Sequence, residues 1–272
     1  MAPAPSWLGR LSPRRRYFAV GLAAVLAVAV AALAAAVIRA AAPSAPGVAG
    51  FPPQDRPGPV LLVPGYGGST GSLSVLARRI RSTGRQAIVV HLPGNGTGSL
   101  AADASVLNAA VTRALQGGAP SVDVIGYSAG GVATLLWARE DGGVHKARRV
   151  VTLGSPFHGT SIASAAQGFV PGACPAACQQ LVPGSSLLSR LDAAPVPARP
   201  RWLSLWSTDD TTVTPPDSAR LAGAINVPIQ SVCPAQQISH SQLPVSPVVT
   251  AMVLQAIGSG PVREPTASDC RA

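Results

Sequence analysis

Short apolar runs alternate with helix-forming runs along residues 59–258, and this alternation constrains the fold more than any other feature of the chain. A short, continuous apolar run is typical of a strand that is buried on both faces. Six such runs stand at 59–64, 86–92, 121–127, 147–156, 201–207 and 226–232. Helices are predicted at 72–84, 99–118, 129–140 and 246–258. The pattern predicts an α/β fold with a mostly parallel central sheet and helices on both faces.

Residues 157–200 break this alternation. They are rich in Gly, Pro, Ser and Cys. Parallel α/β sheets carry their sites at the carboxyl ends of the strands. We therefore expect this segment to form a small cap or loop region over that edge.

The N-terminus predicts export. Arginines at the start precede an uncharged apolar run, 17–38, and small residues follow at 40–42. A cleaved signal peptide fits the basic start and the small residues, whereas an uncleaved anchor fits the length of the run. Both alternatives place the rest of the chain outside the cytoplasm. We expect 1–42 to be the signal peptide or anchor, 43–58 a Pro/Gly-rich linker and 59–272 the catalytic domain.

Charge and composition exclude several classes of protein. The hydrophobic share of 47% is enough for a sizeable core, so the domain is not expected to be disordered. Of the net charge of +10, half lies before residue 43, and the other half is scattered. No basic stripe with interleaved aromatic residues is present, which argues against nucleic-acid binding. We expect a monomer.

The four cysteines lie after the apolar segment, and an even number in an exported chain predicts disulfides. Three pairings are possible. Cys174 and Cys178 bracket Pro-Ala-Ala and can meet in a tight loop, which leaves Cys233 for Cys270. No histidine or second Cys-x-x-Cys stands nearby, so we expect no metal site.

A serine stands between the third predicted strand and the helix after it, in the sequence Gly126-Tyr-Ser128-Ala-Gly130. This is the G-x-S-x-G pattern, in which a sharp turn between strand and helix exposes the serine hydroxyl. The pentapeptide alone is a weak match, but the strand before it and the helix after it supply the expected context. Ser128 is therefore the candidate nucleophile.

A serine hydroxyl needs a base, and the base in turn needs an acid that orients it. Hydrolases that carry their serine in a G-x-S-x-G turn place serine, acid and histidine in that order along the chain. Of the four histidines, His240 alone follows both Ser128 and the acidic pair Asp209-Asp210. His240 is therefore the candidate base, and His145 is expected at the surface.

The candidate acid comes from the loop "TDDTT" after the fifth predicted strand. Asp210 is followed by two residues, then by Val213 as an apolar anchor and by Pro215. We expect this spacing to turn Asp210 inward while Asp209 points out, so Asp210 is the preferred acid.

Acyl transfer also needs backbone N–H groups that stabilise the developing oxyanion. The residue after the nucleophile, Ala129, supplies one. The glycine-rich loop Pro64-Gly-Tyr66-Gly-Gly68 follows the first predicted strand, and the Tyr66 N–H is the second candidate.

The chain resembles small secreted lipases of the α/β-hydrolase fold, both the class 2 bacterial lipases and the yeast lipase B type. The matching stretches are "LLVPGYGGS", "GYSAGG", "TLGSPFHGT", "STDDTTVTP" and "NVPIQSVCPAQQISHSQL". The resemblance covers about 59–270 and is weak at 160–200. It implies hydrolysis of carboxylic esters, often acylglycerols, without a cofactor. In the lipase B type a cysteine between the last strand and the catalytic histidine pairs with a later one, which supports Cys233–Cys270.

The favoured function is therefore an exported serine carboxylic-ester hydrolase, a lipase acting on lipid esters. An acyltransferase or a polyester-degrading esterase would use the same residues and differ in water exclusion, which the sequence does not show. A third alternative is a non-catalytic binding protein on the same fold. The intact set of serine, aspartate and histidine argues against it. The expected partners are an ester or lipid substrate and, through residues 17–38, a membrane.

Overall fold

The computed structural model divides the chain into two units, Met1–Ala49 and Gly50–Ala272. It describes residues 24–34, 50–169 and 174–270 and the single residues 12, 14, 17, 22 and 172. In the first unit, residues 24–34 are helical. Within the described residues, no helix combines the length and the apolar character that crossing a membrane requires. Residues 1–11 and 35–49, which hold parts of the expected signal peptide or anchor and of the expected linker, lie outside the described residues.

A parallel sheet of six strands forms the centre of the second unit. The strand order is β2-β1-β3-β4-β5-β6, and every neighbouring pair is parallel. The strands are β1 (Val60–Val63), β2 (Ala87–Val89), β3 (Val122–Tyr127), β4 (Ala147–Leu153), β5 (Arg201–Trp206) and β6 (Ile225–Pro228). All six lie within or beside the predicted runs, and the α/β class with a parallel sheet is as expected.

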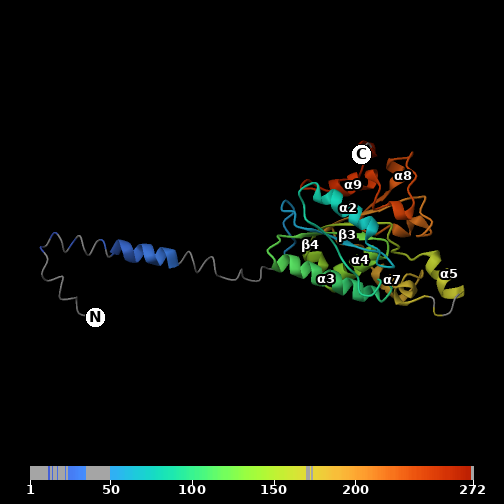
Figure 1. Cartoon of the computed structure of the whole chain (residues 1–272), viewed down its shortest axis with the longest axis horizontal. Coiled ribbons are helices and arrows are strands. Elements are labelled where there is room, and N and C mark those ends of the chain that lie inside the picture. Colours follow the sequence, from blue (N-terminus) through green and yellow to red (C-terminus); the bar gives the residue numbers. More distant parts are fainter. Residues whose placement is uncertain are drawn as a thin grey trace. The chain divides into compact units, whose positions relative to one another are not determined.

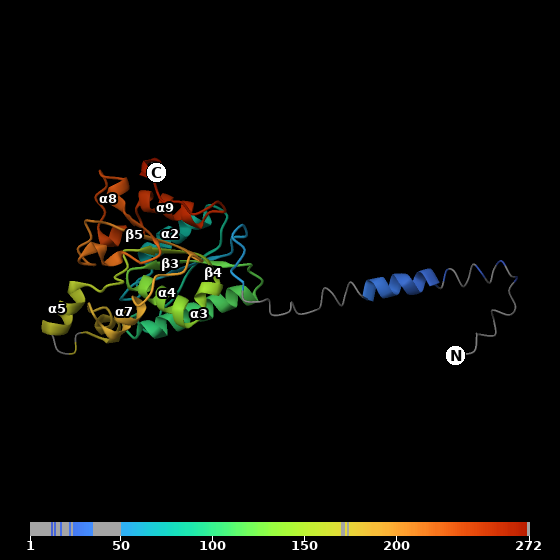
Figure 2. The ribbon, with the colours of Figure 1, turned by 180° about the vertical axis from the view of Figure 1, so that it is seen from behind.

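Helices cover both faces of this sheet (Figures 1 and 2). On one face, α3 (Leu100–Gln116) and α4 (Ala129–Glu140) pack against strand residues such as Val124 and Val150. On the other, α2 (Gly71–Arg81) and α9 (Pro247–Ile257) pack against residues such as Ile125 and Val151. Alternate side chains of a strand point to opposite faces, so the four inner strands β1, β3, β4 and β5 contribute to both cores. This explains why consecutive residues in these strands are largely apolar.

Two predicted strands differ from the structure. The run 86–92 gives only the three-residue strand β2, which lies at the edge of the sheet and leaves Ile88 exposed. The run 226–232 is a strand only as far as Pro228, after which Ile229–Val232 forms the short helix α8. Proline lacks an N–H and is favoured at strand ends and before helices, and this chemistry ends β6 there.

The segment between β4 and β5 contains three short helices, α5 (Ser161–Phe169), α6 (Ala176–Gln180) and α7 (Ser186–Leu191). A disulfide joins Cys174 to Cys178 at the start of α6. In both views α5 lies at the rim of the domain (Figures 1 and 2). The expected cap or loop region is thus a small helical one.

The chain after β6 holds α8, the single-turn helix η4 (His240–Gln242), α9 and the final turn η5 (Ala267–Cys270). A disulfide joins Cys233, just after α8, to Cys270. Both disulfides join the pairs that the sequence favours. The second one fastens the end of the described chain to the segment that carries His240.

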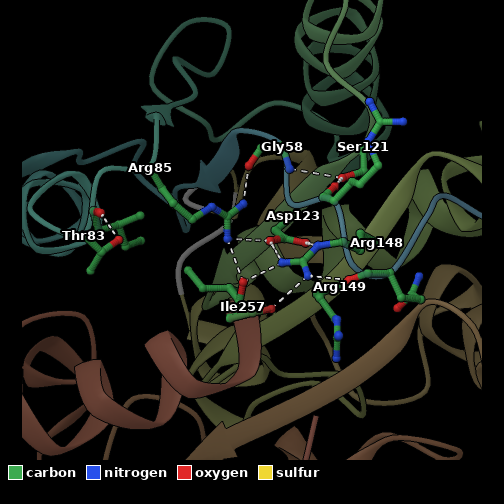
Figure 3. A network of polar contacts seen from close by, with 12 residues as sticks. Gly58, Thr83, Arg85, Ser121, Asp123, Arg148, Arg149 and Ile257 are labelled. Atoms are coloured by element: carbon green, nitrogen blue, oxygen red, sulfur yellow. Dashed lines mark hydrogen bonds and ion pairs between the residues drawn. The ribbon is translucent and has the colours of Figure 1, made fainter. Parts of the chain in front are cut away.

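An ion-pair network occupies the amino-terminal edge of the sheet (Figure 3). The fully buried Arg148 donates to both carboxylate oxygens of Asp123, at 3.0 and 2.5 Å. Arg85 lies 2.8 Å from the same carboxylate. Arg148 also donates to the carbonyls of Gln54 and Ile257. The network therefore joins the segment that enters the domain, the central strands and the end of α9.

Candidate active site

Ser128 stands on a strained turn at the carboxyl end of β3. Its φ of 53° and ψ of −129° lie outside the regions that L-residues ordinarily adopt. Among the described residues it is the sole non-glycine with a positive φ. Such strain is sustained only where the surroundings fix it, and it is concentrated at active sites. The turn places Ser128 directly before the first residue of α4, as the G-x-S-x-G pattern predicts.

The glycines of this turn are required by close packing. A Cβ on Gly126 would lie 2.5 Å from the Cα of Gly131, and one on Gly130 would lie 2.3 Å from the carbonyl oxygen of Pro64. Both distances are far below van der Waals contact. The chain can therefore turn from β3 into α4 beneath the Pro64 loop only with glycine at these positions.

His240 and Asp210 are hydrogen-bonded to each other. Nδ1 of His240 lies 2.6 Å from Oδ2 of Asp210, and both residues are buried. This bond would hold the imidazole with its other nitrogen, Nε2, free to take a proton. His240 opens η4, after the last strand, and Asp210 lies in the loop after β5.

The residues next to this pair connect it to Ser128. The Ser128 N–H donates to the Leu153 carbonyl at 2.9 Å, at the end of the neighbouring strand β4. The next residue, Gly154, has a positive φ of 55°. A Cβ there would lie 3.1 Å from Nδ1 of His240 and 3.2 Å from Oδ2 of Asp210. Ser128 and the His240–Asp210 pair therefore both lie near the carboxyl ends of β3 and β4.

The loop after β5 directs Asp210 inward by its own hydrogen bonds. Oδ1 of Asp210 accepts from the N–H groups of Thr212 and Val213, at 2.8 and 2.9 Å, which leaves Oδ2 for His240. Val213 is buried, as expected of an apolar anchor. Asp209 is exposed and accepts a hydrogen bond from Gln230. The two neighbouring carboxylates thus point to different surroundings.

The glycine-rich loop after β1 lies over Ser128. A Cβ on Gly65 would be 2.8 Å from the Cβ of Ser128, so the loop backbone can approach the serine only at glycine. Neither Tyr66 nor Ala129 donates its backbone N–H to an acceptor in the described part of the chain. The Ala129 N–H is also the first of α4, where the helix dipole favours negative charge. Both groups are available to an oxyanion.

A cavity of about 160 Å³ opens beside Ser128. Its walls are mostly apolar and come from the Tyr66 loop, from α5 and α6 and from the loop that carries Val213. The residues that line it include Ile162, Ala163, Ala166, Cys178 and Leu181. The arrangement can hold an apolar group of modest size next to the serine hydroxyl.

Tyr127, the residue before the candidate nucleophile, also belongs to the site, although the sequence did not predict a role for it. Its ring lies 5.1 Å from the imidazole of His240, and its hydroxyl donates to the His240 carbonyl at 3.2 Å. Burial, and then the charge of Asp210, raise the pKa of Tyr127 to about 12, so the hydroxyl keeps its proton. Tyr127 therefore positions the histidine loop. Its place inside G-x-S-x-G is the one signal that could have indicated this role.

The other histidines do not join this group. His91, His145 and His158 are exposed. His158 contacts Asp192 at 3.3 Å and the Ser218 carbonyl at 3.1 Å. In the described residues, no group of three or more His, Cys, Asp or Glu side chains is placed to hold a metal ion.

Comparison with known proteins identifies the fold. Residues 58–172 match the model of the alpha/beta hydrolase fold family. This stretch runs from the start of β1 to beyond Ser128. The chain has the α/β-hydrolase fold. This confirms the fold class predicted from the sequence. A search of curated protein sequences finds no match to the chain.

Solved structures of lipases share this α/β-hydrolase architecture. Lipase B of Aspergillus fumigatus aligns with a TM-score of 0.63 and 18% identity, over 80% of this chain and 56% of the lipase. The mature lipase BlEst2 of Bacillus licheniformis aligns with a TM-score of 0.53 and 19% identity, over 65% of this chain and 84% of the lipase. At these identities the likeness establishes the fold. The chain spans only about half the length of the Aspergillus lipase.

A third similar structure comes from work on LipS and LipT, two metagenome-derived lipolytic enzymes. It aligns with a TM-score of 0.52 and 19% identity, over 69% of this chain and 86% of that one. All three of these structural neighbours are described as lipases or lipolytic enzymes. At 19% identity this likeness, too, establishes the fold alone.

Proposed function

We propose that the protein is an exported serine carboxylic-ester hydrolase, a lipase that acts on acylglycerols or similar lipid esters. The observation that carries the proposal is the 2.6 Å hydrogen bond between His240 and Asp210 beside the strained Ser128. A non-catalytic binding protein would have no need of this strain or of a buried, paired imidazole. The lipases among the structural neighbours support the same reaction class.

In the proposed reaction, Ser128 Oγ attacks the ester carbonyl carbon while His240 Nε2 takes the hydroxyl proton. The tetrahedral oxyanion accepts hydrogen bonds from the N–H groups of Tyr66 and Ala129, each worth about 3 kcal/mol. The imidazolium is stabilised by Asp210 and returns its proton to the leaving alcohol. Water then attacks the acyl-enzyme by the same route and releases the acid.

The cavity beside Ser128 supports an acyl group as its occupant. Its lining is mostly apolar and it holds none of the charged residues of the chain. An apolar pocket with a few convergent polar groups is typical of a substrate site. Acylglycerols and other esters of apolar acids fit this chemistry better than charged substrates do.

Export is part of the proposal. The basic start and apolar run of residues 1–42 support it, and so do the two disulfides, which persist in oxidising compartments. Fractionation of cells that express the full chain, with sizing of the mature N-terminus, distinguishes a cleaved signal peptide from a retained segment. Recovery of the reduced, full-length chain in the cytoplasm would contradict export.

The reaction is tested with purified full-length protein and p-nitrophenyl esters of increasing chain length. We expect steady turnover of the esters. If deacylation is the slow step, a burst of p-nitrophenol equal to the enzyme concentration should precede it. Addition of an alcohol acceptor separates hydrolysis from acyl transfer: a hydrolase releases mainly the free acid. Absence of turnover with all esters would contradict the proposal.

A further inference from the structure

A second cavity lies at the opposite edge of the sheet from Ser128, and its lining is basic. Its volume is about 550 Å³. Three arginines line it, together with a single acid, Asp55. They are Arg149 on β4, Arg201 at the start of β5 and Arg199, two residues before that strand begins. In a parallel sheet, strand starts and strand ends lie at opposite edges, so this cavity is remote from the candidate active site.

Two of these arginines are neighbours in the sheet. Arg149 pairs in register with Arg201 across β4 and β5, so their side chains stand side by side on one face. The register of β4 against β3 shifts between Val122 and Asp123, which leaves Arg148, the residue before Arg149, without a partner in the register. Such an irregularity re-aims the side chains around it. Like charges held side by side on a sheet repel each other unless a counter-charge is present.

Neither Asp55 in the lining nor the nearby Asp123 supplies the counter-charge through an ion pair. Asp123 is already shared by Arg148 and Arg85, at 2.5 and 2.8 Å. The side chain of Arg149 points away from this carboxylate (Figure 3). No ion pair of Arg149, Arg199 or Arg201 with a carboxylate occurs among the described residues.

Arg149 is also incompletely hydrogen-bonded although it is only 4% exposed. Its Nη2 donates to the Gly260 carbonyl at 2.9 Å. Its Nε is buried and has no partner among the described residues. Burial lowers the pKa of Arg149, and the charges of Arg148 and Arg201 lower it further against the opposing effect of Asp123. A buried guanidinium with an unused donor and no carboxylate partner is unusual enough to require an explanation.

We propose that this cavity, named here the Arg149 cavity, binds a phosphate group through Arg149, Arg199 and Arg201. Guanidinium groups bind phosphate oxygens through paired, charge-assisted hydrogen bonds. One dianion among three guanidinium groups removes the repulsion between Arg149 and Arg201. The cavity is open and larger than inorganic phosphate, so it also accommodates a phosphate monoester, including a phospholipid headgroup.

Calorimetric titration of the full chain with inorganic phosphate at low salt tests this site. We expect one saturable phosphate per chain. The double variant Arg199→Gln/Arg201→Gln should bind phosphate at least about tenfold more weakly, because it loses charge-assisted hydrogen bonds. Both arginines are exposed, so these substitutions spare the fold, unlike a substitution of Arg149. The matched control is Arg78→Gln, which removes one exposed arginine on α2, away from this cavity.

Vesicles distinguish the two sources of phosphate. The wild-type chain and the double variant share the same N-terminal segment, so a difference in their binding reports the Arg149 cavity. Weaker binding of the variant to phosphatidic acid vesicles, but not to phosphatidylserine vesicles, assigns a lipid headgroup. Equal binding of both chains, together with saturable binding of inorganic phosphate, assigns a soluble phosphate. No saturable phosphate binding, or equal affinity in the double variant and the wild type, would overturn the site.

Discussion

Nδ1 of His240 and Oδ2 of Asp210 form a 2.6 Å hydrogen bond between two loops that are 30 residues apart in the sequence. Only Oδ2 is available for this bond, since Oδ1 accepts from two backbone N–H groups of its own loop. The pairing therefore depends on a carboxylate that is held in place before any substrate binds.

Replacing Asp210 by asparagine should preserve the fold and impair the reaction. The amide favours the wrong imidazole tautomer, so turnover should fall by up to about 10⁴-fold. Turnover of a soluble ester, with melting as the check on folding, measures this effect.

The matched control is Asp209→Asn. Asp209 is exposed, and an exposed substitution typically changes stability by about 0.5 kcal/mol or less. We expect near wild-type turnover. A large loss in Asp209→Asn with little change in Asp210→Asn would reverse the assignment of the acid.

The cavity beside Ser128 predicts a preference for short acyl chains. At roughly 30 Å³ for each small group, as for a water molecule, its volume of about 160 Å³ holds about five such groups. Among p-nitrophenyl esters, kcat/KM should therefore be highest at about four to six acyl carbons and fall for palmitate.

A large residue at Ala166, which lines this cavity, should shift the preference. Ala166→Phe should reduce hexanoate hydrolysis strongly and leave acetate hydrolysis nearly unchanged, because the acetyl group needs much less of the cavity than the hexanoyl group does. A parallel loss on both esters would indicate damage to the fold instead of a smaller acyl cavity.

Asp123 should be important for stability. Its carboxylate is fully buried and forms ion pairs with both Arg148 and Arg85 (Figure 3). Removal of one partner of a buried ion pair typically costs about 3–5 kcal/mol. We expect Asp123→Asn to lose that amount of unfolding free energy in urea titrations, while Glu264→Gln, at an exposed acid, loses almost none.

Activity for each folded molecule should be unchanged in Asp123→Asn, since the network lies at the other edge of the sheet from Ser128. Stability equal to wild type would show that Arg148 and Arg85 are accommodated without their shared carboxylate.

Asp103 should make stability depend on pH. It is 2% exposed, its Oδ1 has no partner among the described residues, and burial raises its pKa to about 6. The folded state therefore binds the proton more tightly than the unfolded state, whose pKa is about 3.9. This contribution to stability is fully present below pH ~4 and is lost as the pH rises through about 6.

Asp103→Asn, which is neutral at all pH values, isolates this effect. The melting temperature of the variant, relative to that of the wild type, should increase as the pH rises from 4 to 7. The difference corresponds to about 2 kcal/mol, on the order of 1.4 kcal/mol for each pKa unit. A difference between variant and wild type that is constant with pH would contradict the assignment.

Local sequence patterns were sufficient to predict most of the fold. Buried parallel strands have continuous apolar sequences, and helices such as α3 and α9 begin at serine caps whose side chains accept backbone N–H groups. The errors fall where these signals are weak. The run 86–92 is apolar like an inner strand but lies at the edge, because strand order depends on tertiary packing that a single strand does not encode. At 226–232 the strand end is encoded locally by Pro228, which the apolar character of the run conceals.

The candidate site was predictable to the extent that its residues lie in motifs. Ser128, Tyr66 and Ala129 lie in glycine-rich turns whose spacing is local, and Asp210 lies in a loop that hydrogen-bonds to itself. The contacts of Tyr127 with His240 and of Gly154 with the His240–Asp210 pair join residues far apart in the chain. The Arg149 cavity likewise depends on the register of β4 against β5, which the sequence does not reveal.

Labelling with a fluorophosphonate tests the central claim, that Ser128 is an activated nucleophile, most directly. The reagent reacts with serines that a neighbouring base activates. We expect the intact mass of the wild-type chain to increase by one phosphonyl group, peptide mapping to place it on Ser128, and Ser128→Ala to remain folded but unlabelled. Labelling at another residue, or ester hydrolysis that persists in Ser128→Ala at the wild-type rate, would contradict the account.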